Sequence, residues 1–298
     1  MNVTEGLLLL LERILRAPSP FNLARLVAAG VKGPTDITPD VLARLTLTRR
    51  EELLGDQLQH LPHGTRRFAD AAPPVRAGMT GSGADLLVLT WTAADLARER
   101  RAGARLLTHL GVRPGMAVAN TLRGALVTPG ALLLGDVVEE IGALDVPLGA
   151  IENEAAARQA WELIDRVRPT VIVVEPASAA RLFAAAPKAE RTWWQGMIVL
   201  HGGTPQFQAI SVPDAAGFSG WQRAWLAVPE ATSFAAYACA AGRMHCDEGV
   251  IAEVVDDTLV LTSLGVDTPV LRYASGVCAK ALTAPCPCGS PDMGIDLR

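Results

Sequence analysis

Lysine is scarce in this sequence, and long apolar runs are missing from it. Only Lys32, Lys188 and Lys280 occur, and the formal net charge is −4 at pH 7. Nucleic-acid-binding domains are usually basic, so this balance argues against a nucleic-acid partner. No apolar run reaches the length of a membrane helix, and the N-terminal run GLLLLLERIL is too short, and too acidic at its start, for a signal peptide. We therefore expect a cytoplasmic protein with no membrane segment.

Cysteine is absent from the first 238 residues and clustered after them. The five cysteines are Cys239, Cys246, Cys278, Cys286 and Cys288. An odd, clustered set in a chain without a leader favours a metal site over a disulfide framework. Thiolates and one imidazole suit tetrahedral Zn²⁺ of a structural kind, and buried free thiols are the alternative. The predicted ligands are Cys239, His245, Cys286 and Cys288, with Cys246 as an alternative to His245.

Apolar periodicity predicts an α/β fold in three segments. Residues 1–75 have helical spacing, including one helix over 38–57 that begins with a Thr cap. Residues 76–192 alternate between strand and helix patterns, which is typical of a layered domain with a mostly parallel sheet. Residues 193–298 are rich in strands, with a β-meander that turns at Asp256–Asp257 and a tail that we expect to be a loop.

A glycine-rich loop lies between Arg76 and Thr92. Two glycines and two small hydroxyl residues fall within Thr80–Asp85, shortly after Gly78 and directly before an apolar run. Such a loop can place its backbone N–H groups around a phosphate, although an ordinary turn before a strand has the same composition. The predicted phosphate-binding residues are Thr80, Gly81, Ser82 and Gly83.

The order of segments resembles the phenylacetate–CoA ligase branch of the adenylate-forming acyl-CoA synthetase superfamily. The resemblance covers most of the chain and includes TAADLARERRAGARLLTHLGVRPGMAVAN, IDRVRPTVIVVEPASAARL, LHGGTP, TSLGVDTPVLRYASG and CPCG. It implies the layered α/β N-terminal domain of such a ligase, with Gly202 and Gly203 beside adenine and Arg272 beside ribose. It also implies a zinc ion on the Cys/His set, as in some members, and a possible homodimer.

The sequence departs from this family where ATP would be bound. Asp85 stands at the position of the loop lysine, where a carboxylate would repel a triphosphate. Val277 replaces the ribose-binding aspartate, and only Glu230 remains of the adenine and Mg²⁺ motif. The sequence stops at Arg298, so we expect the small C-terminal domain to be missing. These departures argue against ATP-dependent adenylation and leave ATP or AMP binding in doubt.

Three side chains are candidates for chemistry in the old substrate cleft. Arg123 can pair with a carboxylate or phosphate, although a solvent-facing arginine is the alternative. His201 suits acid–base work, although a histidine beside such a turn is more often a polar turn residue. With Glu230, they predict a cleft that takes a small acyl or aryl ligand in specialised biosynthesis, without ATP. Two alternatives remain: an AMP-forming ligase that uses a C-terminal domain in trans, and a non-catalytic partner of a full-length paralogue.

Overall fold

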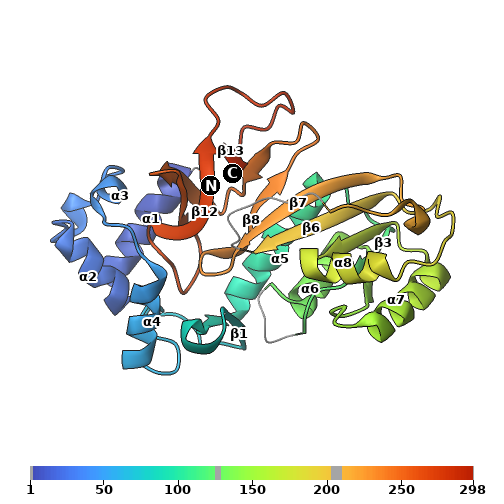
Figure 1. The fold of residues 1–298 in the computed structure, drawn as a ribbon. Helices are drawn as coiled ribbons and strands as arrows, with labels where there is room; N and C mark the ends of the chain where they lie inside the picture. Colours follow the sequence, from blue (N-terminus) through green and yellow to red (C-terminus); the bar gives the residue numbers. More distant parts are fainter. Residues whose placement is uncertain (1–2, 125–128, 203–209, 298) are drawn as a thin grey trace.

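One large sheet organises the part of the chain that the computed structural model describes, residues 3–124, 129–202 and 210–297. Eleven strands from these residues lie in the order β10-β11-β12-β13-β9-β8-β7-β6-β5-β3-β4 (Figure 1). Their bounds are β3 Ala117–Asn120, β4 Leu144–Pro147, β5 Val171–Val174, β6 Gly196–Gly202, β7 Trp221–Val228, β8 Thr232–Ala238, β9 Met244–Cys246, β10 Val250–Val255, β11 Thr258–Ser263, β12 Tyr273–Ala281 and β13 Gly294–Leu297.

Strands β3 to β7 are mutually parallel and are covered by helices on both faces. Strand β5 is buried throughout: Val171 and Val173 pack toward α5 (Ala93–His109) and α6 (Ala131–Ile141). Ile172 and Val174 pack toward α7 (Glu154–Val167) and α8 (Pro176–Ala184) on the opposite face. This two-sided burial explains the continuous β-branched run, and the layered α/β fold predicted from the sequence is confirmed.

The parallel sheet continues past residue 193, where the sequence pattern changes from alternating strands and helices to mostly strands. Strands β6 and β7 pair in parallel with each other and belong to the same sheet as β5. The direction reverses only at the β7–β8 hairpin, after which the sheet is antiparallel. The segments 76–192 and 193–298 therefore share one sheet.

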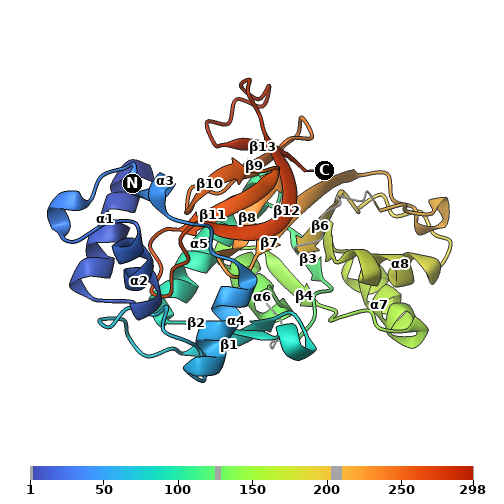
Figure 2. The ribbon, with the colours of Figure 1, turned by 60° about the vertical axis from the view of Figure 1, so that its left-hand side comes forward.

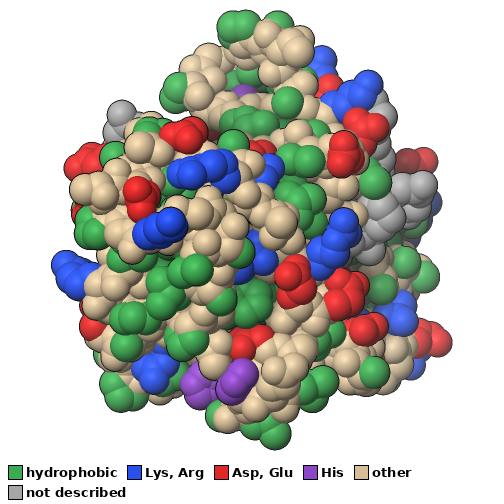
Figure 3. Space-filling model, turned by 90° about the vertical axis from the view of Figure 1, so that its left-hand side faces the viewer, with side chains coloured by type: hydrophobic (Ala, Val, Ile, Leu, Met, Phe, Trp, Pro, Cys, Tyr) green, Lys and Arg blue, Asp and Glu red, His purple; other side chains and the backbone are tan. Residues whose placement is uncertain are grey.

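Four α-helices precede β1 and lie at one end of the molecule (Figure 1). They are α1 (Val3–Arg16), α2 (Pro20–Ala28), α3 (Val41–Arg44) and α4 (Arg50–Gln59). Helices α1 to α3 pack through an apolar cluster that includes Leu264 and Leu271, whereas Leu53 of α4 packs with the sheet strands. Figure 2 shows β10–β12 beside these helices. Figure 3 shows the face they present, where basic, acidic and hydrophobic side chains are interspersed.

The single helix predicted over residues 38–57 is wrong, because the chain breaks between α3 and α4. Thr48 lies in this break and forms a parallel bridge with Tyr273. Its N–H donates to the carbonyl of Arg272 at 2.8 Å, and its carbonyl accepts from Ala274 N–H at 2.9 Å. Thr46 and Thr48 are β-branched, which favours an extended strand-like conformation here. This bridge fixes where α4 begins.

A second, small sheet holds the glycine loop. Strand β1 (Arg76–Thr80) pairs with β2 (Leu87–Trp91), and the 3₁₀ turn Gly83–Asp85 lies between them.

The turn predicted at Asp256–Asp257 is confirmed, since both residues have positive φ, 49° and 57°. The loop predicted for the tail is wrong at its end, where β13 pairs with β9 and β12 and buries Ile295. Among the described residues, we find no helix whose length and apolarity would let it cross a membrane.

Candidate ligand cleft and metal centre

A cavity of about 560 Å³ lies at the carboxyl ends of β6 and β7. Ligand sites of open parallel sheets form at this edge, because loops from neighbouring strands meet there. The cavity brings together the glycine loop, the start of α4, the start of α8 and the beginning of β12. Its lining consists of Arg50, Thr80, Gly81, Arg123, Pro129, Glu175, Pro176, Ala177, Leu200, His201, Ala227, Val228, Pro229, Glu230, Tyr273 and Ser275.

Five of the residues predicted from the sequence line this one cavity. They come from four separate stretches of the chain and are Thr80, Gly81, Arg123, His201 and Glu230. His201 and Glu230 are nearly buried, at 4% and 8% exposure. Burial lowers the pKa of the His201 imidazole below its ordinary value, so the ring is neutral at pH 7. A neutral imidazole can accept a proton, as acid–base chemistry requires.

Ser82, Gly83 and Arg272 are the described cleft predictions that lie outside the cavity lining. Ser82 precedes the 3₁₀ turn and Gly83 begins it, and neither lines the cavity. Gly202 ends β6, and Gly203 lies outside the described residues. Arg272 pairs through Nε with Glu253 at 3.1 Å and donates through Nη1 to the carbonyl of Leu45 at 2.6 Å. Its neighbours Tyr273 and Ser275 line the cavity instead.

Arg50 is the central cation of this cleft, and sequence reasoning missed it. Its Nη1 pairs with Glu230 Oε1, and its Nη2 donates to the carbonyls of Thr80 at 2.9 Å and Asp85 at 2.5 Å. Gly81 has φ +80°, and a Cβ there would collide with the Asp85 carbonyl and the Arg50 guanidinium. The glycine loop therefore turns two carbonyl oxygens toward an arginine.

Arg123 is the second cation of the cleft. Its Nε lies 3.4 Å from Glu175 Oε2, and its side chain is 58% exposed. Glu175 directly precedes α8 and was not predicted as a site residue. Tyr273, beside them in the lining, is 3% exposed, and burial followed by the Glu230 charge raises the pKa of its phenol. The cavity wall thus carries two arginine–carboxylate pairs, Arg50 with Glu230 and Arg123 with Glu175.

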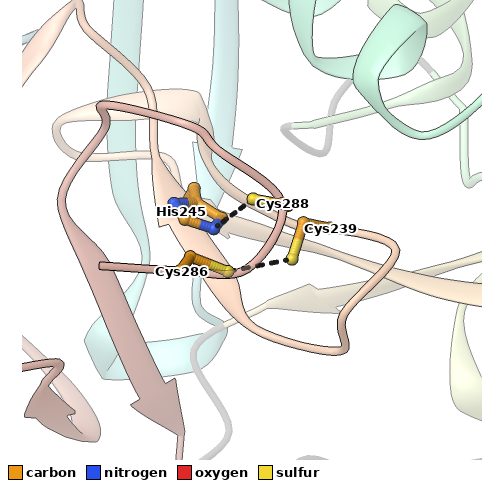
Figure 4. A group of neighbouring side chains, drawn as sticks. All are labelled: Cys239, His245, Cys286 and Cys288. Atoms are coloured by element: carbon orange, nitrogen blue, oxygen red, sulfur yellow. Dashed lines mark hydrogen bonds between the residues drawn. The ribbon is translucent and has the colours of Figure 1, made fainter. Parts of the chain in front are cut away.

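The four predicted metal ligands come together at the far end of β8 (Figure 4). Cys239 follows β8 and His245 lies in β9, while Cys286 and Cys288 lie in the loop between β12 and β13. One ligand atom from each residue lies within 4.8 Å of the others. The two sheet strands thus hold one pair of ligands, and the Cys-Pro-Cys loop brings the second pair.

The spacing within this group fits a tetrahedral zinc ion. Cys239 Sγ lies 3.7 Å from Cys286 Sγ, and Cys288 Sγ lies 3.3 Å from His245 Nε2. Zn–S and Zn–N bonds of ordinary length at tetrahedral angles require edges of about 3.8 Å and about 3.6 Å. His245 Nδ1 lies 3.2 Å from the carbonyl oxygen of Asp292, which can accept a hydrogen bond from Nδ1–H and so leave Nε2 free to bind a metal.

The alternative ligand, Cys246, faces the opposite way. It is 4% exposed and belongs to the apolar cluster that contains Leu53 and Leu261. Burial raises the pKa of its thiol to about 12. The pKa of Cys239 moves the other way: partial burial raises it, but hydrogen bonds, first from the backbone of Arg243 and Ala241, lower it to about 7. Cys239 is therefore readily converted to the thiolate that a metal binds.

Comparison with known proteins identifies the fold. No family model matches the chain, and no curated protein matches its sequence. A 2-hydroxyisobutyryl-CoA ligase, solved in an open conformation with 2-HIB-AMP and CoA, matches 99% of this chain and 72% of its own, with TM-score 0.83 and 19% identity. The same ligase in its postadenylation state with 2-HIB-AMP matches with TM-score 0.80 and 18% identity.

This chain has the fold of an adenylate-forming CoA ligase. It spans 65% of the postadenylation structure's chain and 72% of the open one. At this identity the likeness establishes the fold, and the phenylacetate–CoA ligase branch stays a prediction from sequence.

Proposed function

We propose that the cleft binds a small acyl or aryl carboxylate, or a ligand derived from one, without ATP. The observation that carries the proposal is the placement of Arg50 and Arg123 on the wall of one cavity at the carboxyl ends of the parallel strands. A volume of about 560 Å³ suits a small-molecule ligand. The two guanidinium groups supply the charge-assisted hydrogen bonds that select a carboxylate.

The same contacts argue against a triphosphate in this loop. Phosphate loops bind through backbone N–H groups, whereas the Thr80 and Asp85 carbonyls here face Arg50. Asp85 and Val277 replace the residues that grip phosphate and ribose in the family that the sequence resembles. In this proposal Glu230 and the neutral His201 face the bound ligand and move protons, while Arg50 orients it.

Calorimetric titration of the full chain tests this proposal. The probes are 2-hydroxyisobutyrate, benzoate, phenylacetate and their CoA thioesters, each without ATP. We expect at least one to bind, and Arg50→Met to weaken it by about tenfold or more, because a charged hydrogen-bond partner is lost. Arg49→Met is the matched control, because Arg49 is exposed and lies outside the cavity lining. Micromolar binding of ATP–Mg²⁺, or no binding of any probe, would contradict the proposal.

A second candidate is an AMP-forming acyl-CoA ligase that adenylates its acid in this cleft. The fold of 2-hydroxyisobutyryl-CoA ligase supports this candidate. ATP–pyrophosphate exchange with the same acids separates the two. ATP–pyrophosphate exchange that depends on the added acid would favour the ligase and contradict the ATP-independent proposal.

We also propose that Cys239, His245, Cys286 and Cys288 hold one Zn²⁺ with a structural role. All four donors come from the protein, which fills a tetrahedral shell and leaves no position for a substrate. Bound there, the ion would fasten the loop after β12 to strands β8 and β9.

A further inference from the structure

Arg66 lies buried behind Glu230, on the side away from the ligand cavity. It is 3% exposed, although arginine is rarely buried without a partner. It shares with Glu230 the wall of a second, much smaller chamber of about 30 Å³. Glu230 thus lies between two cavities, with Arg50 at one and Arg66 at the other. Sequence reasoning did not single out Arg66.

The other carboxylates on this chamber already have close hydrogen-bond donors. Asp95 accepts from the N–H groups of Thr92 at 3.0 Å and Asp267 at 2.8 Å. Glu99 accepts from the Thr232 hydroxyl and the Ser233 N–H, both at 2.9 Å. Glu230 differs, because its contact on the side of the ligand cavity is the Arg50 guanidinium.

The charges around Arg66 also point to Glu230. Burial lowers the pKa of the Arg66 guanidinium, and the opposing raising effects come first from Glu230 and then from Asp56 and Tyr273. Arginine stays protonated even so, and a buried cation must then be matched by an anion. Glu230 is the carboxylate that does this most strongly.

The chamber is large enough for an ordered water and is lined to bind one. Its volume of about 30 Å³ exceeds the roughly 10–15 Å³ that one ordered water requires. The Oγ1 of Thr268 lines it and has no hydrogen-bond partner among the described residues. Arg66, Glu230 and this hydroxyl together offer both donors and acceptors, which a buried water requires.

We propose that Arg66 is a positioning residue that holds Glu230 from its buried side through ordered water, so that Arg50 can exchange Glu230 for the anionic group of a ligand. Arg50 keeps its two carbonyl acceptors in the glycine loop during the exchange, and Glu230 keeps Arg66. Neither charge is then left buried and unpaired. The exchange rests on the proposed function, whereas the coupling between Arg66 and Glu230 does not.

A double-mutant cycle on urea unfolding tests the coupling without any ligand. We expect Arg66→Met to raise the unfolding equilibrium constant about a hundredfold. The variant leaves the buried Glu230 carboxylate with only one of its two neighbouring arginines. Adding Glu230→Gln should recover about tenfold of that loss. Arg191→Met is the matched control: Arg191 is equally buried but pairs with Asp165, so Glu230→Gln should recover nothing there. Additive effects of Arg66→Met and Glu230→Gln would overturn the proposal.

Rescue by a conservative variant separates positioning from packing. Arg66→Lys keeps a positive charge on this side of Glu230, so it should restore part of the stability that Arg66→Met loses. Equal losses in the two variants would contradict us. If Arg66→Met does not fold, recovery of folding by Glu230→Gln supports the coupling, and failure of both opposes it.

A crystal structure of the full chain at high resolution provides a second arm. We expect a water within hydrogen-bond distance of both Arg66 and Glu230; an Arg66 guanidinium turned away from Glu230 would overturn the proposal. The carboxylate titrations then test the exchange. If the cycle shows coupling but no carboxylate binds, the proposed function fails while the role of Arg66 stands.

Discussion

Strand β8 connects two sites that are assembled in different ways. At its far end, the proposed metal site takes two side chains from one β-hairpin and two from one Cys-Pro-Cys loop. At its near end, the cleft takes single side chains from α4, the glycine loop, β6 and the residues after β7. Ligands that repeat at short spacing reveal a site in the sequence, whereas charges that meet across 180 residues, as Arg50 and Glu230 do, are revealed only by the fold.

The largest expected effect concerns the metal end of this comparison. Cys286→Ser should remove the zinc ion and lower the free energy of unfolding by on the order of several kcal/mol, because metal binding contributes directly to folding. Elemental analysis, at about one zinc per chain in the unmutated protein, and urea unfolding measure it. Cys278→Ser is the control, since Cys278 lies in β12 outside the group. A protein that contains no metal and is fully stable would contradict the proposed metal site.

A smaller effect is expected at the glycine loop. Gly81→Ala should lower the free energy of unfolding by about 1–3 kcal/mol and displace Arg50, because a Cβ at positive φ meets both the Asp85 carbonyl and the guanidinium. Gly83→Ala is the matched control: its φ is +56°, but nothing lies within 4 Å of its Cβ. Equal losses in the two variants would show that the loop is strained but not fastened to Arg50.

The smallest effect is the titration of His201 at the cleft. Its pKa is lowered in the folded state, so the unfolded chain takes up more protons as pH falls below about 6.5. The free energy of unfolding should therefore fall by on the order of 1 kcal/mol between pH 7 and pH 5. The His201→Gln variant should not show this decrease. Urea unfolding at both pH values measures the difference. An identical pH dependence in both proteins would contradict a buried neutral imidazole.

The sequence predicted the local elements of the fold but not the contacts between residues that are far apart in the chain. The layered strands and helices, the Asp256–Asp257 turn and the four clustered metal-ligand positions follow from periodicity, turn chemistry and spacing. The break in the helix at Thr48 could not, because Tyr273 on a distant strand causes it. Arg50 and Arg66 lie in stretches with no motif, and only their placement against Glu230 distinguishes them from other arginines.

The Thr48–Tyr273 bridge also determines when the cleft can form. Arg50 follows Thr48 by two residues, and Tyr273 itself lines the cavity. While the chain is being synthesised, the segment that carries Arg50 and the glycine loop emerge early, but Glu230 and Tyr273 leave the ribosome only after most of the sheet strands. The ligand-binding surface is therefore among the last parts of the molecule to be completed.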